Sequence, residues 1–363
     1  MSLFSRIFLT LALLAHFAEP VTAADSSPRL VLITLDGVRW QDVFRGPDPV
    51  LTENSHYTHE DLKESVQKAW IEVPDRGAAL MPFLHEMART GGTLYGNRDK
   101  GECMKVVNDM WFSYPGYNEI LTGRPDNRIT SNDKIYNPTV TFLEWLNRRP
   151  GFEGQVTAFG TWDVFPYIIN DKRSGVPVNA GLGNRFPTDT LTARLALQTL
   201  RKSKPRVLYI GMGDTDELAH VGNYEQYLAA ANRADDFIRT IWETIEADPV
   251  MRGKTTLIVT TDHGRGEAAD ETWTEHSSKT YLEMYPTYLR DYTKTGIIGS
   301  DAIWFAAIGP GVKLGSPLAS TKADAVGACA TQSQIAASAL TALGIDWRRF
   351  DPNAGMPLPQ FAP

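Results

Sequence analysis

Cysteine is scarce in this chain of 363 residues, which contains only Cys103 and Cys329. The two do not form a Cys-x-x-Cys pair, so the sequence gives no sign of a thiolate zinc site. In an oxidising compartment they could form a disulfide. The sequence leaves this open, because it does not say whether their Cα atoms come within bridging distance.

Long apolar runs and an excess of positive charge are also missing. Beyond the N-terminus, no stretch approaches the ~18 consecutive apolar residues of a transmembrane helix. The chain has 36 Lys and Arg residues and 43 Asp and Glu residues, which gives a formal net charge of -7. Without a general basic field, the protein is not expected to bind a nucleic-acid polymer. With 42% hydrophobic and 22% charged residues, its composition is that of a globular protein.

The first 23 residues have the pattern of a signal peptide. Arg6 precedes an apolar run from Ile7 to Phe17, and Val21-Thr22-Ala23 fits a small-x-small cleavage site. The run is short for a membrane span, and no cysteine near the cleavage site offers lipid attachment; an ordinary buried N-terminal helix is the alternative. We therefore expect a periplasmic or secreted protein, with residues 24–363 forming one domain without a membrane span.

From residue 29 onward, short β-branched apolar runs alternate with amphipathic stretches. This pattern predicts an α/β fold with a doubly wound, mostly parallel central sheet and helices on both faces. Strands are expected at 30–35, 155–159, 206–210, 256–260 and 303–308, and helices at 78–89, 139–148, 188–201, 223–246 and 331–343. Polar segments near 44–76, 170–187 and 264–300 are expected to be loop insertions that form a small cap.

Three of the expected strands run directly into acidic residues, which are Asp36, the pair Asp214 and Asp216, and Asp262. Because open α/β sheets bind ligands beyond the carboxyl ends of their strands, we expect these acids to converge. Asp216 and His220 are four residues apart, so on a helix they project to the same side. This spacing favours Asp216 over Asp214 as a metal ligand.

Three of the seven histidines, His220, His263 and His276, lie beside these acid-rich strand ends. Any one of them alone has an ordinary structural or solvated explanation, so the interpretation depends on the set. Three carboxylates and three imidazoles would supply two sites of mixed nitrogen and oxygen ligation, which suits catalytic zinc. Magnesium or calcium would be expected to use fewer imidazoles. The sequence therefore predicts two divalent metal ions, zinc before others.

Ser113 is the candidate nucleophile, in the segment Trp111-Phe112-Ser113-Tyr114-Pro115-Gly116-Tyr117. Pro115 indicates the start of a helix, where free N–H groups and the helix dipole favour an anion. Coordination to a dication lowers the pKa of a serine hydroxyl and makes the alkoxide available. Ser-x-Pro is also a common N-cap pattern, so the segment alone has a structural explanation.

Other side chains near Ser113 have two interpretations each. The surrounding aromatic residues, with Tyr136, Trp162, Phe165 and Tyr167, could stack on an aryl group or nucleobase, although packing is the more ordinary role. Lys172, Arg173 and Arg265 could contact phosphate, but we expect them to be solvated.

The order and context of these motifs resemble the alkaline phosphatase superfamily, particularly its nucleotide pyrophosphatase/phosphodiesterase-like branch. The matching segments are Val31 to Gly37, Ser113 to Asn118 with Leu121 to Pro125, Asp216 to His220, Thr261 to Gly264, and His276.

The resemblance implies a set of site residues. Asp36, Ser113, Asp262 and His263 would bind one zinc ion, and Asp216, His220 and His276 the other. It further implies that Ser113 attacks phosphorus in line to give a phosphoserine, which water then hydrolyses. Asn132 would donate to a nonbridging phosphate oxygen, with Asn127 and Asn137 as nearby alternatives.

Two departures bear on the reaction that the resemblance implies. A sulfatase of this superfamily would carry arginine at the position of Tyr117, which argues against sulfatase activity. The phosphodiesterase branch usually has threonine where this chain has Ser113, so the choice between monoesters and diesters stays open. We expect a hydrolase of small phosphate esters, with nucleotides among the candidates. The alternatives are a catalytically silent, metal-dependent binding protein and a sulfatase-like or phosphomutase-like relative.

Overall fold

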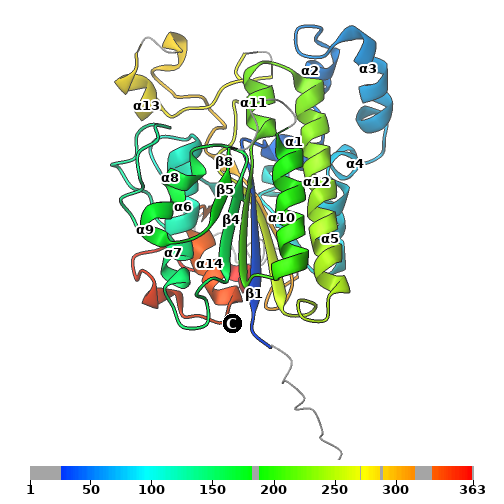
Figure 1. The fold of residues 1–363 in the computed structure, drawn as a ribbon. Helices are drawn as coiled ribbons and strands as arrows, with labels where there is room; N and C mark the ends of the chain where they lie inside the picture. The colour runs from blue at the N-terminus through cyan, green and yellow to red at the C-terminus, as the bar shows by residue number, and fades with distance from the viewer. Residues whose placement is uncertain (1–25, 182–187, 270, 287–288, 315–328, 362–363) are drawn as a thin grey trace, which may run out of the picture.

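A central sheet of seven strands organises the protein. The computed structural model describes residues 26–181, 188–269, 271–286, 289–314 and 329–361, so the expected signal peptide lies outside it. The strands are β1 (Arg29–Leu35), β2 (Thr93–Tyr95), β4 (Val156–Gly160), β5 (Val178–Ala180), β6 (Val207–Met212), β7 (Thr255–Thr261) and β9 (Phe305–Ile308). Their order is β2-β9-β7-β1-β6-β4-β5. Figure 1 shows the sheet in the middle of the molecule, with β1, β4 and β5 labelled.

Five neighbouring strands, from β7 to β5, run parallel, whereas β9 is antiparallel to β7 and β2 is antiparallel to β9. The predicted α/β fold with a mostly parallel sheet is therefore confirmed. The expected strand 303–308 is divided between two sheets. β8 (Ala302–Ile303) joins β3 (Met104–Lys105) and β10 (Ala330–Thr331) in a small second sheet, while β9 belongs to the large one.

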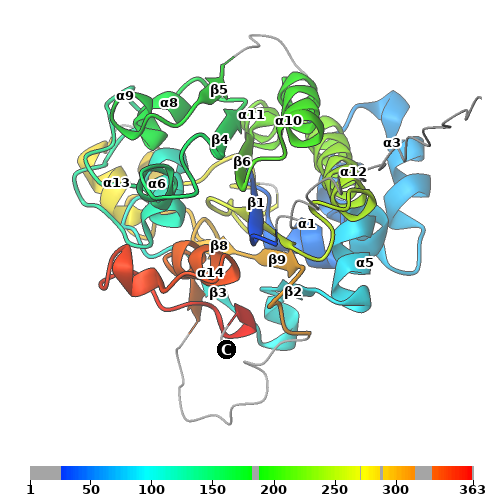
Figure 2. The ribbon, with the colours of Figure 1, turned by 60° about the horizontal axis from the view of Figure 1, so that its bottom comes forward.

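Helices cover both faces of the large sheet (Figure 2). One face carries α5 (Pro82–Thr90), α10 (Asp189–Ser203) and α12 (Tyr224–Ala247); the other carries α6 (Ser113–Thr122), α7 (Phe142–Asn147), α8 (Phe165–Ile169) and α14 (Gln334–Ala342). In β1, Leu30 and Leu32 pack into the core under α6 and α14, and Val31 and Ile33 into the core under α12. This alternation follows from the two-residue period of a strand.

Some helix boundaries differ from the expectation. The helix expected at 78–89 is interrupted at Met81, between α4 (Arg76–Leu80) and α5, because Pro82 disfavours helical geometry in the residue before it. The helix expected at 331–343 begins only at Gln334, since Thr331 is a β10 residue. The helix expected at 139–148 is confined to α7, which begins after Thr141 caps it.

The segments expected to be loop insertions contain regular structure. Residues 44–76 include the end of α1 (Trp40–Arg45), α2 (Pro49–Glu53), α3 (Glu60–Val66) and a π-helical turn, Gln67–Ile71. The segment 170–187 supplies α9 (Asp171–Ser174) and the edge strand β5, and residues 182–187 lie outside the described part. The segment 264–300 contains α13 (Lys279–Met284). Among the described residues, no helix is both long and apolar enough to cross a bilayer.

Candidate metal centre

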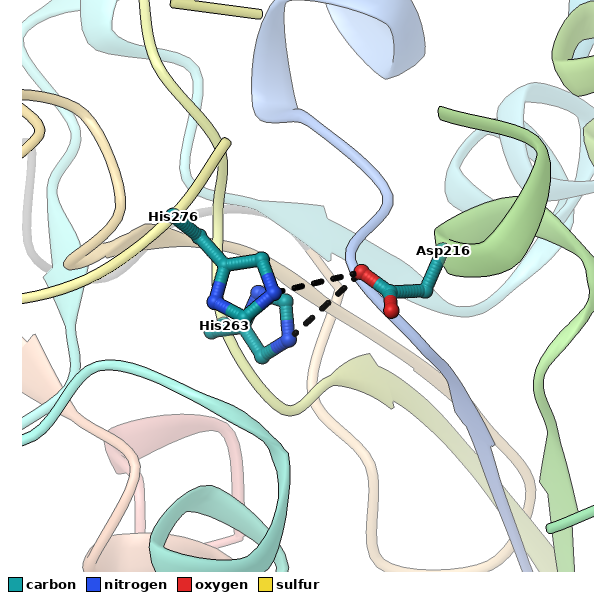
Figure 3. Close-up of side chains that lie close together, drawn as sticks. All are labelled: Asp216, His263 and His276. Atoms are coloured by element: carbon teal, nitrogen blue, oxygen red, sulfur yellow. Dashed lines mark ion pairs between the residues drawn. The ribbon is translucent and has the colours of Figure 1, made fainter. Parts of the chain in front are cut away.

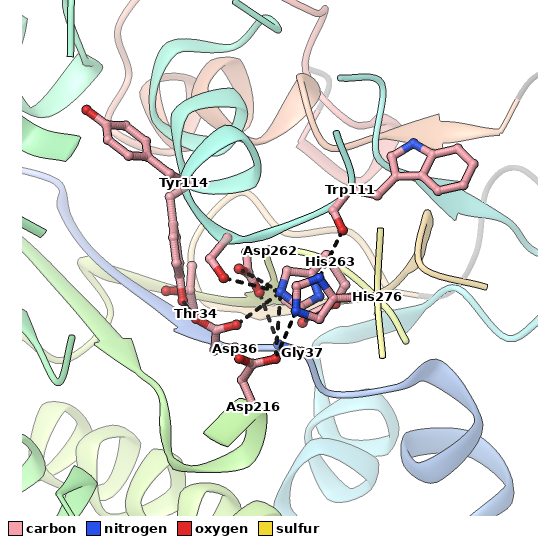
Figure 4. Close-up of polar contacts among 12 residues, drawn as sticks. Thr34, Asp36, Gly37, Trp111, Tyr114, Asp216, Asp262, His263 and His276 are labelled. Carbon is pink, nitrogen blue, oxygen red and sulfur yellow. Dashed lines mark hydrogen bonds and ion pairs between the residues drawn. The ribbon is translucent and has the colours of Figure 1, made fainter. Parts of the chain in front are cut away.

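The acidic strand ends predicted from the sequence meet at one edge of the sheet. Asp36 follows β1, and Asp262 with His263 follows β7. α11 (Asp214–His220) begins two residues after β6 and carries Asp216. Because β7, β1 and β6 are adjacent and parallel, with Leu35 paired to both Thr261 and Met212, their carboxyl ends lie side by side (Figure 4).

The first group consists of Asp36, Asp262 and His263, all buried, with ligand atoms within 4.8 Å of one another. His263 Nε2 lies 3.2 Å from Asp36 Oδ1 and 3.5 Å from Asp262 Oδ2. Although both oxygens are buried, neither accepts a hydrogen bond of acceptable geometry from the described residues. A buried carboxylate oxygen without such a partner is costly, and a cation would compensate for it. The donor set thus fits a divalent metal ion.

The second group consists of Asp216, His263 and His276, whose ligand atoms lie equally close together (Figure 3). His276 Nε2 is 3.6 Å from Asp216 Oδ1. His220 joins them, because its Nε2 lies 3.3 Å from Asp216 Oδ2 and 3.0 Å from His276 Nε2. The structure therefore brings together the three carboxylates and three imidazoles that were predicted as metal ligands.

Two backbone carbonyls fix the orientation of the imidazoles. His263 Nδ1 lies 2.8 Å from Gly264 O, and His276 Nδ1 lies 3.3 Å from Trp111 O. Because a carbonyl oxygen can only accept, each Nδ1 carries the hydrogen and each Nε2 faces the carboxylates. The backbone of Trp111 has a φ of 59°, which is uncommon outside glycine. In this conformation the Trp111 carbonyl oxygen points at His276.

The buried charges shift the pKa values of these groups. Burial and the charge of Asp36 raise the pKa of Asp262 well above its ordinary value. Burial opposes protonation of His263, but the carboxylates of Asp262 and Asp36 outweigh it and raise its pKa to about 9. Burial and the neighbouring His263 lower the pKa of His276. Without metal, the cluster holds protons that a metal ion would displace.

Ser113 is the first residue of α6, and its buried Oγ lies 3.4 Å from His263 Nε2. Tyr114 N, in the next residue, donates a hydrogen bond of 3.0 Å to Asn132 Oδ1, so Asn132 lies beside the start of this helix. The alternative Asn137 is fully buried and donates to Asn118 and to the carbonyl of Ile168. Of the two, Asn132 is the one brought next to Ser113.

α6 packs directly on the segment that carries Asp262. A Cβ atom at Gly116 would lie 2.4 Å from the carbonyl oxygen of Asp262, so only glycine allows this approach. One residue later, the Tyr117 hydroxyl donates a 2.9 Å hydrogen bond to Asp36 Oδ2. The sequence interpretation missed this contact. The signal for it was the four-residue spacing that puts Ser113 and Tyr117 on one face of the helix.

Asp214 points away from the cluster, since it accepts hydrogen bonds from Thr188 and from the backbone N–H of Asp189. The spacing argument for Asp216 thus agrees with the geometry. The expectation that Arg265 is solvated was wrong, because it is fully buried and ion-paired with Asp216.

The two other basic residues, Lys172 and Arg173, contact groups outside the cluster of candidate ligands. Arg173 donates to Glu144, and Lys172 Nζ lies 4.7 Å from the centroid of the Tyr136 ring. The aromatic residues divide into those buried in the core, Phe112, Tyr114, Tyr117 and Phe165, and those partly exposed, Trp111, Tyr136, Trp162 and Tyr167.

Comparisons with known proteins bear on the family. Residues 172–281 match the model of the metalloenzyme superfamily, a range that contains Asp216, His220, Asp262, His263 and His276. The comparison with curated proteins finds no match.

Solved structures share the fold. The C-terminal periplasmic domain of EcEptC from Escherichia coli has a TM-score of 0.53 and 13% identity, covering 94% of this chain and 90% of that one. A 2-O GAG sulfatase has a TM-score of 0.50 and 13% identity, covering 88% and 71%. Inactive murine ectonucleotide pyrophosphatase/phosphodiesterase 5, in complex with AMP, has a TM-score of 0.50 and 12% identity, covering 88% and 95%. The family-model match makes residues 172–281 similar to the metalloenzyme superfamily, and the solved structures show that the fold of this chain is shared with them.

Proposed function

We propose that this chain is an exported hydrolase of small phosphate esters that uses two zinc ions and Ser113 as its nucleophile. The observation that carries the proposal is the pair of buried oxygens, Asp36 Oδ1 and Asp262 Oδ2, which accept no hydrogen bond of acceptable geometry from the described residues. Both lie near His263 Nε2, which is 3.4 Å from the Ser113 hydroxyl oxygen. Groups that hold cations next to a hydroxyl are what phosphoryl transfer to serine requires.

Each residue has a role in the proposed reaction. The bound ions would supply the positive charge that lowers the pKa of the Ser113 hydroxyl and stabilises the attacking and leaving oxygens. Ser113 Oγ, after losing its proton, attacks phosphorus and forms a phosphoseryl ester as the alcohol leaves. Water then cleaves this ester, which restores the hydroxyl and releases phosphate. The amide of Asn132, beside the start of α6, would donate to a nonbridging oxygen.

The choice of zinc rests on the donor set. Three imidazoles among six ligand side chains suit zinc better than magnesium or calcium, which prefer oxygen ligands. Export is supported by the pattern of residues 1–23 and by a disulfide between Cys103 and Cys329, because disulfides persist mainly in oxidising compartments.

A side-by-side assay of the zinc-loaded protein tests the reaction class. The substrates are an aryl phosphate, a bis-aryl phosphate, a nucleoside monophosphate and an aryl sulfate. We expect turnover of phosphate esters and none of the sulfate. Ser113→Ala should keep its zinc and lose at least about a thousandfold in turnover, because the nucleophile is gone. Mass spectrometry of the quenched wild type should find one phosphoryl group on Ser113.

Ser131→Ala is the matched control, because it removes a partly exposed hydroxyl next to Asn132, one that donates to Asp133, and should leave turnover unchanged. Full activity of Ser113→Ala would refute the nucleophile. No turnover of any ester, together with zinc-dependent thermal stability, would instead favour a catalytically silent binding protein.

A further inference from the structure

Arg265 is the one arginine in contact with the candidate ligands among the described residues, and the proposed reaction gives it no role. Its side chain is fully buried, and its Nη1 is ion-paired with Asp216. An arginine remains protonated at every accessible pH, so its burial requires that its charge and its N–H groups be matched by acceptors.

The other donors of Arg265 reach the loop that leads to His276. Nε donates to the carbonyl of Trp273 at 3.0 Å, and Nη2 donates to the carbonyl of Thr274. One planar guanidinium thus holds α11, through Asp216, and the 273–276 segment at a fixed separation. Asp216 and His276 are two of the three residues proposed to bind the second zinc ion.

The residues packed around Trp273 and Arg265 leave the connection between α11 and the 273–276 segment little room to move. Trp273 is fully buried, with its ring in contact with Tyr57, Tyr224 and Tyr227 at centroid distances of 5.1 to 6.0 Å. A Cβ at Gly37 would lie 2.8 Å from both Arg265 Nη1 and Asp216 Oδ1, so the ion pair fills the space beside this glycine.

The ion pair with Arg265 also determines which acceptor positions of the Asp216 carboxylate remain available to a cation. Arg265 occupies one acceptor position of Oδ1, and Oδ2 faces His220 Nε2 at 3.3 Å. A carboxylate has about four acceptor positions, so Asp216 can bind a cation while Arg265 keeps its orientation. Partners of this kind typically change metal affinity by about 10-fold to 100-fold when removed.

We infer that Arg265 is a positioning residue for the second metal site, which it assembles by joining Asp216 to the loop that carries His276. The inference rests on the proposed two-metal function. It assigns Arg265 to the site of Asp216, His220 and His276, and leaves the site of Asp36, Asp262 and His263 independent of it.

The test compares Arg265→Met, which removes the charge and all three contacts, with Arg265→Lys, which keeps the charge but not the planar fork. Zinc content and the two dissociation constants are measured by competition with a chromophoric chelator, and the cobalt(II) absorption spectrum reports each site separately. We expect both variants to bind one ion with wild-type affinity and the other at least about tenfold more weakly, with Arg265→Met the weaker.

Arg39→Met is the matched control. Arg39 is equally buried and bidentate to Asp42, with Nε 2.7 Å and Nη2 2.9 Å from its oxygens, yet its side chain contacts no candidate ligand. This variant should lose thermal stability but bind both ions as the wild type does. If Arg265→Met does not fold, Arg265→Lys decides the question by the same measurements.

Three outcomes would overturn the inference. They are unchanged affinities in both Arg265 variants, tighter binding of the second ion, which would mean that the guanidinium competes with metal, and an equal loss in Arg39→Met. A wild-type protein that binds no zinc would instead contradict the proposed function itself, so the two failures are distinguishable.

Discussion

Tyr117 fixes one oxygen of Asp36 and leaves the other facing His263. Burial and the charges of Asp262 and Asp36 raise the pKa of its hydroxyl, so it stays a hydrogen-bond donor. Tyr117→Phe should therefore weaken zinc binding at the Asp36 site by about tenfold, because Asp36 loses its orienting partner. The fold should survive, since the ring still packs on Phe165. Titration against a chelator measures the change.

Tyr209→Phe provides the comparison for this prediction. Its hydroxyl is as buried as that of Tyr117 but bonds to Thr34, which is not a candidate ligand. Equal losses of zinc affinity in the two variants would show that the effect comes from general destabilisation and not from Asp36.

At the scale of single residues, the sequence could predict the candidate metal ligands but not the side chains that orient these ligands. Asp36 and Asp262 stand directly after apolar β-branched runs, and His220 is one helical turn from Asp216, so local patterns place them. The burial of Arg265 depends on where the 273–276 segment returns in space. No local pattern contains that information, and a charged residue after Gly264 is ordinarily solvated.

Among the secondary-structure elements, α12 caps α5. Asp235 of α12 accepts hydrogen bonds from Phe83 N at 2.7 Å and Leu84 N at 2.9 Å, at the start of α5. Burial raises the pKa of Asp235 to about 6, despite these donors. The folded state therefore holds this proton more tightly than the unfolded chain does, and the resulting stability, present below about pH 4, is lost as the pH rises through about 6.

The side chain of the Asp235→Asn variant cannot ionise, so the substitution should remove this pH dependence of the unfolding free energy. In the metal-free protein, the difference in unfolding free energy between wild type and variant should fall by up to about 3 kcal/mol from pH 4 to pH 7. Urea denaturation in the presence of a chelator measures it at each pH. Asp236→Asn, at the exposed neighbouring position, removes only the smallest of the contributions that raise this pKa, so its curve should run nearly parallel to that of the wild type. Parallel curves for Asp235→Asn would contradict the assignment.

Long helices and strands could be predicted from the sequence, whereas short ones could not. The central strands and α10 and α12 have enough residues for a periodic signal, and each was placed within a few residues. The strands β3, β8 and β10 have two residues each, too few for any pattern. The helices within 44–76 are mostly exposed, so they lack the apolar stripe that identifies a helix docked on a core.

For the whole molecule, the α/β class follows from the alternation of strand and helix patterns, but the pairing of Cys103 with Cys329 does not. The two cysteines are brought together because each immediately precedes a strand, β3 or β10, and these strands pair in parallel. That pairing is a long-range contact between segments 226 residues apart, which no local pattern encodes.

The disulfide should therefore stabilise the molecule as a whole, since it closes a loop of 226 residues. Its loss should lower the unfolding free energy by about 2–4 kcal/mol, largely by releasing the unfolded chain. Gln332, just beyond β10, donates to the carbonyl oxygens of Thr261 and Asp262, so the small sheet also supports the candidate metal centre. We expect the loss to appear in the denaturation midpoint with and without zinc.

The measurement is denaturation in the presence and absence of a thiol reductant, with Cys103→Ala/Cys329→Ala as the control. The double variant should unfold at the midpoint of the reduced wild type and should not respond to reductant. Because Gln332 is also held by the β3 backbone, through the hydrogen bond from its N–H to Lys105 O, zinc stoichiometry should survive reduction. A wild-type midpoint that ignores the reductant would mean that the two strands hold together without the bond, which would contradict the expected contribution of the disulfide to stability.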